Sequence, residues 1–462
     1  MKIKNLLAIL SLLYCHLAIS SDDNIGYKKT LMGEEYVSLF PPSKIKRKLL
    51  TKEVFFKENK NTYQFGVTSI DDPFFDVDDD SGKIDTVYSL LSLIGVDSVK
   101  SSAADWSKLG DDKNHKNFNM LKFQLDEARK YNLSSSFIIG YPPVGMGVYS
   151  KSIRTAVSNK FMVNYEDYLR FIVKFLKPYD VKYFEVGNEV DAGSHWWIHS
   201  TPIMYVNEVK QLKKILIDSS SNIKIAAFSA TYARSSSNNS PHQGRNFVQE
   251  SLDLGINSYV DAYSLHHFTF PNDDGLIGFF KQELGKRNIE KPLIDTEQMD
   301  VTDNHMYFSK PYQIIKLYAY GFFKYNLKHI DYFMARDAFI EPRVYPVGFT
   351  QGLFDMSWNP KPRLLALAMS IDAMKGRSLI KSGEIDGVVY FLLRDKFGIS
   401  KYKYSLLLWR DGVTNKKIDI GQNQTAETWT LDEIKSNSKY FLTEAPLVIF
   451  SNDINSFSQQ IP

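Results

Sequence analysis

The chain has 462 residues, of which 44% are hydrophobic and 14% aromatic, so a large buried core is expected and a disordered chain is excluded. It carries 56 lysines and arginines against 53 acidic residues, a formal net charge of +3. This near-neutral balance argues against a nucleic-acid partner. The length suits one large domain with a smaller companion.

The N-terminus has the pattern of a secretory leader. Two lysines in the first four residues precede an apolar run, Leu6 to Leu17, and the small residues of Ala18-Ile19-Ser20 follow. We expect a signal peptide over residues 1–20 and a secreted or periplasmic protein. The only cysteine, Cys15, lies in this leader, so the mature chain has no thiol for disulfides or catalysis. No other stretch approaches the roughly 20 apolar residues of a membrane span.

Residues 21–60 form an N-terminal segment, in which Tyr36 to Phe56 is a candidate to add a strand to a β-rich accessory domain. The following acidic stretch, Asp76 to Gly82, faintly resembles a calcium loop. It lacks the glycine and glutamate that such a loop needs at its sixth and twelfth positions, so a solvated loop that caps the next helix is favoured.

Residues 61–376 alternate β-branched or aromatic runs with amphipathic stretches, the rhythm of a parallel sheet. Eight repeats predict a closed (β/α)8 barrel, and no glycine-rich phosphate fingerprint follows the first strand. The strands are expected to begin near Tyr63, Val96, Ser134, Val181, Ile223, Val260, Pro292 and Leu327. Helices are expected over Lys83–Leu93, Phe118–Tyr131, Tyr165–Leu176, Met204–Ile217, Phe247–Leu254, Leu276–Arg287, Tyr312–Tyr325 and Arg363–Met374.

Residues 377–462 change to alternating strands separated by turns, which predicts a small antiparallel β domain. The expected strands are Val388–Leu393, Tyr404–Trp409, Ile418–Ile420, Tyr440–Leu442 and Leu447–Phe450.

Two barrel strands end in glutamates. The fourth strand leads into Gly187-Asn188-Glu189, and the seventh ends in Thr296-Glu297. The carboxyl ends of parallel barrel strands meet at one mouth, so we expect Glu189 and Glu297 to lie close together. Glu185, four residues before Glu189, is roughly 13 Å deeper at about 3.3 Å per residue, which predicts a buried, paired carboxylate.

Two facing carboxyls suit the cleavage of an acetal with retention, in which one protonates the leaving oxygen and the other attacks the anomeric carbon. The ionised carboxylate raises its neighbour's affinity for a proton, and the neighbour becomes the acid.

These motifs resemble those of a clan of retaining glycosidases on (β/α)8 barrels that includes heparanase-like, iduronidase/xylosidase-like and agarase-like families. The resemblance implies that Glu189 is the acid/base, Glu297 the nucleophile, and Asn188 a contact of the substrate 2-hydroxyl. The segment from Asp261 to Phe268 is similar to the clan's strand six, with His266 at its histidine position.

Two departures concern the nucleophile. Phe268 stands where many relatives have a tyrosine that hydrogen-bonds the nucleophile, so another group must hold Glu297, and Tyr263, His267 or a loop residue are the candidates. Lys100 is the only basic residue near the end of strand two, where relatives often have arginine.

The remaining candidates for substrate binding lie near strand ends. They are Tyr141, Trp196, Trp197, His266, His267, Arg336 and Asp337. Flat aromatic rings stack on sugars, and the tryptophans follow the Glu189 motif directly. Arg336 and Asp337 either bind substrate or brace the rim. The adjacent histidines point to opposite faces of a strand and cannot chelate one metal, so we expect no metal or cofactor.

The sequence therefore predicts a secreted retaining glycoside hydrolase with a carbohydrate substrate. The alternatives are a carbohydrate-binding or adhesion protein without turnover and a transglycosylase.

Overall fold

The structure is a computed structural model. It describes residues 28–30, 33–35, 41–51, 63–70, 81–110, 116–193, 197–234, 241–267, 275–299, 310–337, 351–411 and 416–461. The expected leader, most of the calcium-like loop, Trp196 and Phe268 lie outside these ranges.

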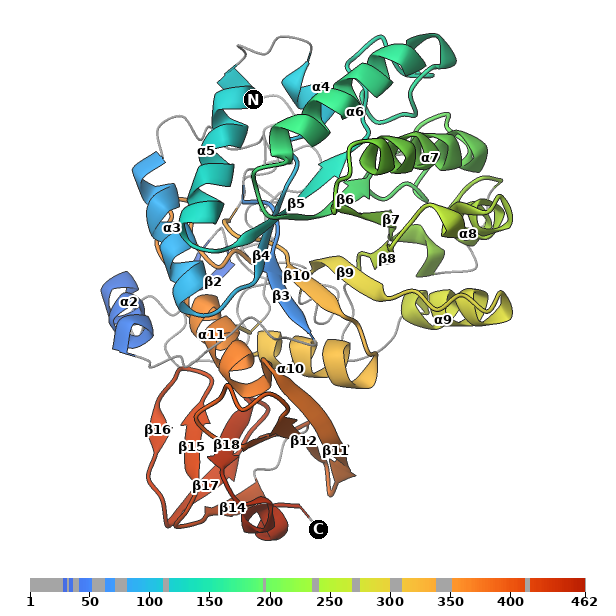
Figure 1. The fold of residues 1–462 in the computed structure, drawn as a ribbon. Helices are drawn as coiled ribbons and strands as arrows, with labels where there is room; N and C mark the ends of the chain where they lie inside the picture. Colours follow the sequence, from blue (N-terminus) through green and yellow to red (C-terminus); the bar gives the residue numbers. More distant parts are fainter. Residues whose placement is uncertain are drawn as a thin grey trace, which may run out of the picture.

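Eight parallel strands close into a barrel with the order β10-β3-β4-β5-β6-β7-β8-β9, so the predicted (β/α)8 fold is confirmed (Figure 1). The strands are β3 (Gln64–Val67), β4 (Ser98–Ser101), β5 (Ser134–Ile139), β6 (Val181–Val186), β7 (Lys224–Ala230), β8 (Ala262–Leu265), β9 (Leu293–Gln298) and β10 (His329–Tyr332). Each begins within two residues of its predicted start.

Helices surround the barrel and bury their apolar faces against it (Figure 1). They are α3 (Ser81–Leu93), α4 (Trp106–Leu109), α5 (Lys116–Lys130), η1 (Asn159–Phe161), α6 (Met162–Leu176), α7 (Pro202–Asp218), η2 (Tyr232–Arg234), α8 (Gly244–Asp253), η4 (Ile256–Ser258), α9 (Leu276–Lys286), α10 (Gln313–Ala319), η5 (Tyr320–Lys324) and α11 (Pro362–Met374). α6 shows the pattern clearly, because its buried residues recur every three or four positions from Tyr165 to Leu176.

After α11 the chain builds an antiparallel β domain, which confirms that part of the predicted fold class. A six-stranded sheet has the order β11-β12-β13-β18-β15-β16, and β14 pairs with β17 in a second sheet. The strands are β11 (Arg377–Ile385), β12 (Val388–Asp395), β13 (Tyr404–Arg410), β14 (Lys416–Ile420), β15 (Thr425–Thr428), β16 (Glu433–Ile434), β17 (Ser438–Leu442) and β18 (Leu447–Ser451), and the 3-10 helix η6 (Ile454–Gln459) follows.

Both faces of the central strands β12, β13 and β18 are buried, because their side chains alternate between two cores. Val389 and Phe391 of β12 belong to the barrel core, and the Phe391 ring lies 5.5 Å from that of Tyr320 in η5. Their neighbours Val388 and Tyr390 belong to a second core, shared with β14 and β17. The accessory domain is thus packed directly onto the barrel through α10, η5 and α11 (Figure 1).

The N-terminal segment differs from its expected role. Pro42–Thr51 form the helix α2, not a strand, and Ile45 and Leu49 of α2 are buried. Their spacing of four residues matches a helix and not the two-residue period of a strand. Lys48 Nζ reaches the accessory domain by donating to the Thr430 carbonyl over 2.9 Å. A short two-stranded sheet, β1 (Lys28–Thr30) with β2 (Gly33–Glu35), precedes this helix.

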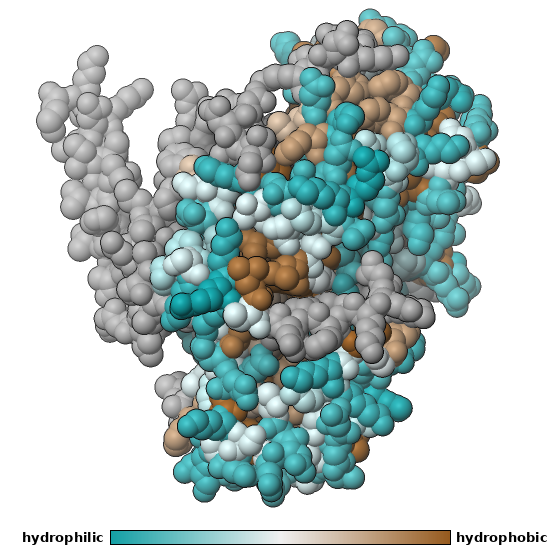
Figure 2. Space-filling model, turned by 60° about the vertical axis from the view of Figure 1, so that its left-hand side comes forward, coloured by the Kyte–Doolittle hydropathy of each residue, from teal (hydrophilic) through white to brown (hydrophobic). Residues whose placement is uncertain are grey.

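Hydrophilic residues cover most of the described surface on the side shown in Figure 2, and apolar residues gather there in limited patches. Within the described ranges, none of the helices has the length and apolar character needed to cross a bilayer.

Candidate active site

The two predicted catalytic glutamates share one partner, His266. His266 Nδ1 lies 3.2 Å from Oε1 of Glu189 and 3.5 Å from Oε2 of Glu297. These two carboxylate oxygens are therefore separated by at most the sum of the two distances, 6.7 Å. Both carboxylates retain a little solvent contact, with side-chain exposures of 14% and 15%. The structure thus brings together two acids at one mouth of the barrel.

Local backbone geometry places Glu189. β6 ends at Val186, and Gly187 turns the chain with φ of 71°. A Cβ at Gly187 would lie 2.5 Å from Val190 Cγ1 and 3.1 Å from the Trp197 ring, so only glycine fits. Glu189 itself has φ of 49°, in the left-handed region that a glutamate rarely adopts. Strained residues of this kind cluster at functional sites.

Neighbouring strands also hold Glu189. Thr231, directly after β7, donates its hydroxyl to Glu189 Oε1 over 2.6 Å. The carboxylate of Asp191 fixes this loop by accepting from the backbone N–H groups of Thr231 (3.0 Å) and Ala233 (2.7 Å). Thr231 was not among the predicted site residues. Its position at the C-terminal end of a barrel strand is the sequence signal that marks it.

Asn188 is held by its main chain. Tyr141 accepts from the Asn188 N–H over 2.9 Å and donates to the Asn188 carbonyl over 2.7 Å. The Asn188 side chain is 7% exposed, and its Oδ1 has no hydrogen-bond partner among the described residues. A buried acceptor of this kind is suited to a ligand hydroxyl. The Tyr141 hydroxyl thus fixes the Asn188 backbone, whereas the sequence predicts that Tyr141 contacts the substrate.

Glu297 lies at the end of β9 between two cations. Besides the His266 contact, its Oε1 is 3.6 Å from Lys100 Nζ. Tyr263, one predicted partner of Glu297, instead packs its ring 5.7 Å from that of Phe228 and donates to Asn257 Oδ1 over 3.4 Å. That prediction is wrong, because Tyr263 points to the helix side of β8.

Glu185 lies below the pair and is buried, as predicted. Its Oε2 is 2.6 Å from Lys100 Nζ. Its Oε1 accepts hydroxyl hydrogen bonds from Ser264 over 2.7 Å, from Thr296 over 2.5 Å and also from Ser229. Five barrel strands or strand ends thus contribute to one buried network.

The charges in this network set its ionisation. Burial would lower the pKa of His266, but Glu297, Glu185 and Glu189 outweigh burial and raise it to about 10, so the ring is an imidazolium at neutral pH. Burial would raise the pKa of Glu189, but hydrogen bonds from His266 and Thr231 lower it below its usual value. Burial raises the pKa of Glu297, although the charges of His266 and Lys100 oppose the rise. Burial also opposes ionisation of Glu185, yet Lys100 and His266 hold its pKa well below the usual range.

The other predicted binding residues lie elsewhere. Trp197 is fully buried, with ring centroids 5.9 Å from Tyr141 and 5.6 Å from Tyr205, so it packs the loop and offers no face for a sugar. The fully buried His267 lies with its ring 6.3 Å from that of Tyr325, which follows η5. Neither side chain has the open surface that the predicted substrate contact requires.

Asp337 pairs with Lys361 at the rim of the barrel after β10. Both oxygens of its carboxylate accept hydrogen bonds from Lys361 Nζ, over 2.9 and 2.7 Å. The carboxylate also accepts a hydrogen bond from the Gly352 N–H over 2.8 Å. Arg336 lies with its guanidinium 4.8 Å from the centre of the Trp358 ring. The sequence leaves open substrate binding or an Arg336–Asp337 pair that braces the rim. Among the described residues the Asp337 carboxylate pairs with Lys361 instead, and bracing of the rim by this pair stays a prediction.

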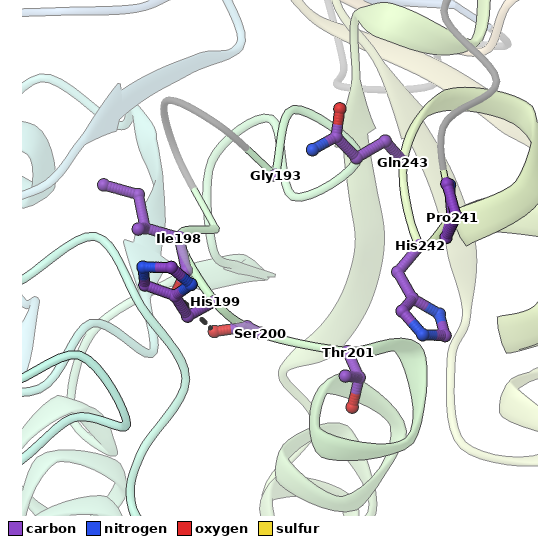
Figure 3. A pocket seen from close by; sticks show the side chains of 8 residues that line it. All are labelled: Gly193, Ile198, His199, Ser200, Thr201, Pro241, His242 and Gln243. Atoms are coloured by element: carbon purple, nitrogen blue, oxygen red, sulfur yellow. Dashed lines mark hydrogen bonds between the residues drawn. The ribbon is translucent and has the colours of Figure 1, made fainter.

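A cavity of about 510 Å³ lies beside the loop that follows β6, Gly187 to Gly193, which we call the Glu189 loop. Figure 3 shows Ile198, His199 and Ser200 on one side and Pro241 and His242 on the other, with Gly193 and Gln243 between them. The backbone joins these walls to the site, because Gly244 N donates to the Asp191 carbonyl over 2.8 Å. The volume falls within the range of pockets that bind small ligands.

No group of three or more histidine, cysteine or acidic side chains suited to a metal occurs within the described ranges. The groups that the site brings together are the carboxylates of Glu189 and Glu297, the imidazole of His266 and the ammonium of Lys100.

A closed parallel barrel with an antiparallel β domain defines the fold class, and solved structures with this fold resemble the chain. A family 39 glycoside hydrolase from Bacteroides cellulosilyticus WH2 superposes with a TM-score of 0.64 at 13% identity, over 84% of this chain and 80% of that one. A GH39 β-xylosidase from Caulobacter crescentus has a TM-score of 0.57 at 14% identity, with coverage of 87% and 98%.

A family 30 subfamily 8 xylanase from Clostridium acetobutylicum also has a TM-score of 0.57 at 14% identity, with coverage of 85% and 96%. No protein-family model and no curated protein sequence matches the chain. At these identities the similarity establishes the fold alone, a (β/α)8 barrel with a β domain.

Proposed function

We propose that this protein is a secreted retaining glycoside hydrolase that cleaves a poly- or oligosaccharide. The observation that carries the proposal is the shared His266 contact, which limits the separation of the Glu189 and Glu297 oxygens to 6.7 Å. Retaining enzymes need carboxyls about 5–5.5 Å apart, and inverting enzymes about 6.5–9.5 Å. Nearly all of the carboxyl separations of inverting enzymes are larger than 6.7 Å, so the separation of Glu189 and Glu297 favours retention. The similar barrels include a xylosidase and a xylanase, which supports a carbohydrate substrate.

In the proposed reaction, a Glu297 oxygen attacks the anomeric carbon while Glu189 gives its proton to the departing glycosidic oxygen. The C–O bond to the leaving group breaks as the ester bond to Glu297 forms. Glu189, now ionised, takes a proton from water, whose oxygen attacks the anomeric carbon and releases Glu297. Asn188 Oδ1 would accept a hydrogen bond from the 2-hydroxyl of the bound sugar.

The ionisation of the free protein bears on which glutamate plays which part. Burial favours the protonated form of Glu297, whereas His266 and Thr231 favour ionised Glu189. The proposed roles require the opposite order of proton affinities once substrate is bound, with Glu189 binding the proton more tightly than Glu297. The position on strand four supports Glu189 as the acid/base. The exchanged assignment is the competing one, and the azide experiment in the Discussion separates them.

Secretion is part of the proposal and rests on the leader pattern of residues 1–20. The cavity beside the Glu189 loop is lined by Gly193 of that loop but not by Glu189 or Glu297, so binding of the leaving-group sugar there is a separate hypothesis, which the Gln243 variant in the Discussion tests.

A panel of polysaccharides and aryl glycosides tests the function. The wild-type protein is expected to release new reducing ends, and the first-formed product is expected to keep the anomeric configuration of the substrate by NMR. Glu189→Gln and Glu297→Gln should each abolish release while the chain stays folded by circular dichroism. Glu433→Gln, on the exposed β16 of the accessory domain, is the matched control and should retain full activity.

Substantial hydrolysis in either active-site variant would refute the assignment. Binding of a polysaccharide without product would favour the non-catalytic alternative. Products longer than the substrate would show that sugar, and not water, accepts the glycosyl group.

A further inference from the structure

Glu185 is a buried acid that the two-carboxylate reaction does not use. It is 1% exposed, and three hydroxyls from β7, β8 and β9 fix one of its oxygens. Its other oxygen contacts Lys100 Nζ at 2.6 Å. A buried carboxylate costs several kcal/mol to desolvate, so its presence calls for a compensating role.

The two cations that touch Glu185 also touch the proposed catalytic carboxylates. Lys100 Nζ is 2.6 Å from Glu185 and 3.6 Å from Glu297. His266 Nε2 is 3.7 Å from Glu185, while Nδ1 of the same ring contacts Glu189 and Glu297. Each cation therefore spans from Glu185 below to the reacting groups above.

We infer that Glu185 is a positioning residue for this site: it anchors Lys100 and His266 so that they hold Glu189 and Glu297 in place for reaction. The inference rests on the proposed function. It also answers which groups hold Glu297 in this chain, namely Lys100 and His266.

The reaction itself shows why a third carboxylate is useful. When Glu297 becomes an ester, its negative charge disappears, and a lysine paired with Glu297 alone would be left as an unpaired buried charge. Because the shorter Lys100 contact is to Glu185, the ammonium keeps its partner through the intermediate. Preorganised charges that do not move during reaction are the ones that stabilise a transition state best.

Several charged groups face Glu297, and the network works through their sum. Lys100 comes from β4, Glu185 and Glu189 from β6 and its loop, and His266 follows β8. Asp331 of β10 adds a further negative charge that acts on Lys100. Removing Lys100 takes away a charge that opposes protonation of Glu297, so the acidic limb of the pH–rate profile is expected to move to higher pH.

A double-substitution cycle separates positioning from a purely structural ion pair. Lys100→Met and Glu185→Gln each leave one buried charge without its partner, and both are expected to lower Tm. The double variant Lys100→Met/Glu185→Gln removes both charges, so Tm should recover. For a positioning pair, kcat of the double variant stays about 100-fold or more below that of the wild type and KM changes less. The acidic limb should move back toward its wild-type position, because the loss of Glu185 removes a charge that raises the pKa of Glu297.

The buried pair between Lys375 and Asp97, at 2.8 Å, is the matched control, since neither residue contacts Glu189 or Glu297 in the described structure. Lys375→Met/Asp97→Asn should leave the shape of the pH–rate profile unchanged. Recovery of both Tm and wild-type kcat by Lys100→Met/Glu185→Gln would overturn the inference.

A readout without turnover keeps this test separate from the proposed function. In ¹⁵N-histidine NMR spectra of the wild-type protein, His266 should stay protonated up to about pH 10. In Glu185→Gln it should titrate at lower pH, because a group that favours the imidazolium is gone. An unchanged titration would overturn the anchoring of His266 by Glu185. A protein that hydrolyses no substrate yet shows the shift would instead disprove the proposed function alone.

Discussion

His266 and Glu189 lie 77 residues apart in the chain, and Nδ1 of the histidine is 3.2 Å from Oε1 of the glutamate. This contact joins the loop after β6 to the end of β8. The same nitrogen reaches Glu297 on β9, so one imidazolium contacts both carboxylates. The charge on His266 is therefore central to how the pair ionises.

Azide rescue is expected to assign the two carboxylates. In Glu297→Ala, azide fills the space of the missing nucleophile, and the glycosyl azide should have the opposite configuration to the substrate. In Glu189→Ala, azide should attack the glycosyl-enzyme instead of water and give a product of retained configuration. Glu189→Ala should also keep fast first-step cleavage of a dinitrophenyl glycoside, whose leaving group needs no acid. The configuration of each glycosyl azide is measured by NMR. An inverted azide from Glu189→Ala and a retained azide from Glu297→Ala would mean that the roles of the two glutamates are exchanged.

The charge of His266 predicts a pH dependence of stability. Its pKa is about 10 in the folded protein and about 6.5 in an unfolded chain, so the folded state binds the proton more tightly. This contribution to stability is fully present below about pH 6.5 and is lost as pH rises through about 10. His266→Gln removes it. Urea unfolding at several pH values should show the wild-type advantage over His266→Gln shrinking from pH 6 to pH 10.

The exposed His199→Gln variant is the control for that experiment and should follow the wild type at every pH. A constant difference between wild type and His266→Gln across the range would contradict an imidazolium at this position.

Gly187→Ala should disturb both fold and activity. A Cβ would lie 2.5 Å from Val190, and φ of 71° is unfavourable for alanine, so we expect a loss of about 1–3 kcal/mol of unfolding free energy. Because Asn188 and Glu189 follow directly, kcat should fall as well. Gly285→Ala, inside α9 with no atom within 4 Å of the new Cβ, is the matched control and should stabilise the protein by up to about 1 kcal/mol. Equal effects of the two substitutions would argue against the steric explanation.

The cavity beside the Glu189 loop makes a prediction about substrate binding. Gln243 lies between its two walls (Figure 3). If the leaving-group sugar binds there, Gln243→Ala should raise KM several-fold and change kcat little, because the interaction is the same in the ground and transition states. Gln282→Ala, on the exposed face of α9, is the control. Steady-state kinetics on oligosaccharides should show the effect, and aryl glycosides without a second sugar should not; equal effects on both would exclude this binding mode.

Periodicity in the sequence was sufficient to predict the barrel strands and the main helices around them, because each has one face that must be buried. The sequence does not predict β11, β15 or β16. Most of β11 is exposed and carries little apolar alternation, and β15 and β16 are only four and two residues long. The terminal glutamates could be predicted from their places at strand ends. The contacts of Lys100 and His266 could not be predicted, because they depend on which side chains point into the barrel at the same height along its axis. That height is set by the strand register, which shifts in β7 after Ala227.

Trp197 shows the same limit for an aromatic residue. A tryptophan near a catalytic loop suits sugar stacking and loop packing equally well in sequence, and only the positions of Tyr141 and Tyr205 reveal that its ring is enclosed. Burial of a side chain by residues distant in the chain is a tertiary property that local pattern does not contain.

The pair between Asp337 and Lys361 gives a final prediction, on whether the rim after β10 is braced or binds substrate. Both side chains are buried, at 4% and 5% exposure, and their closest atoms are 2.7 Å apart. Asp337→Ala leaves the lysine unpaired and should cost about 3–5 kcal/mol of unfolding free energy. The double variant Asp337→Leu/Lys361→Met should recover most of that loss and, for a bracing pair, keep the wild-type KM. A KM that stays high after stability has recovered would instead show that Asp337 contacts the substrate, because the neutral pair restores the packing of the rim but supplies no carboxylate to a sugar hydroxyl.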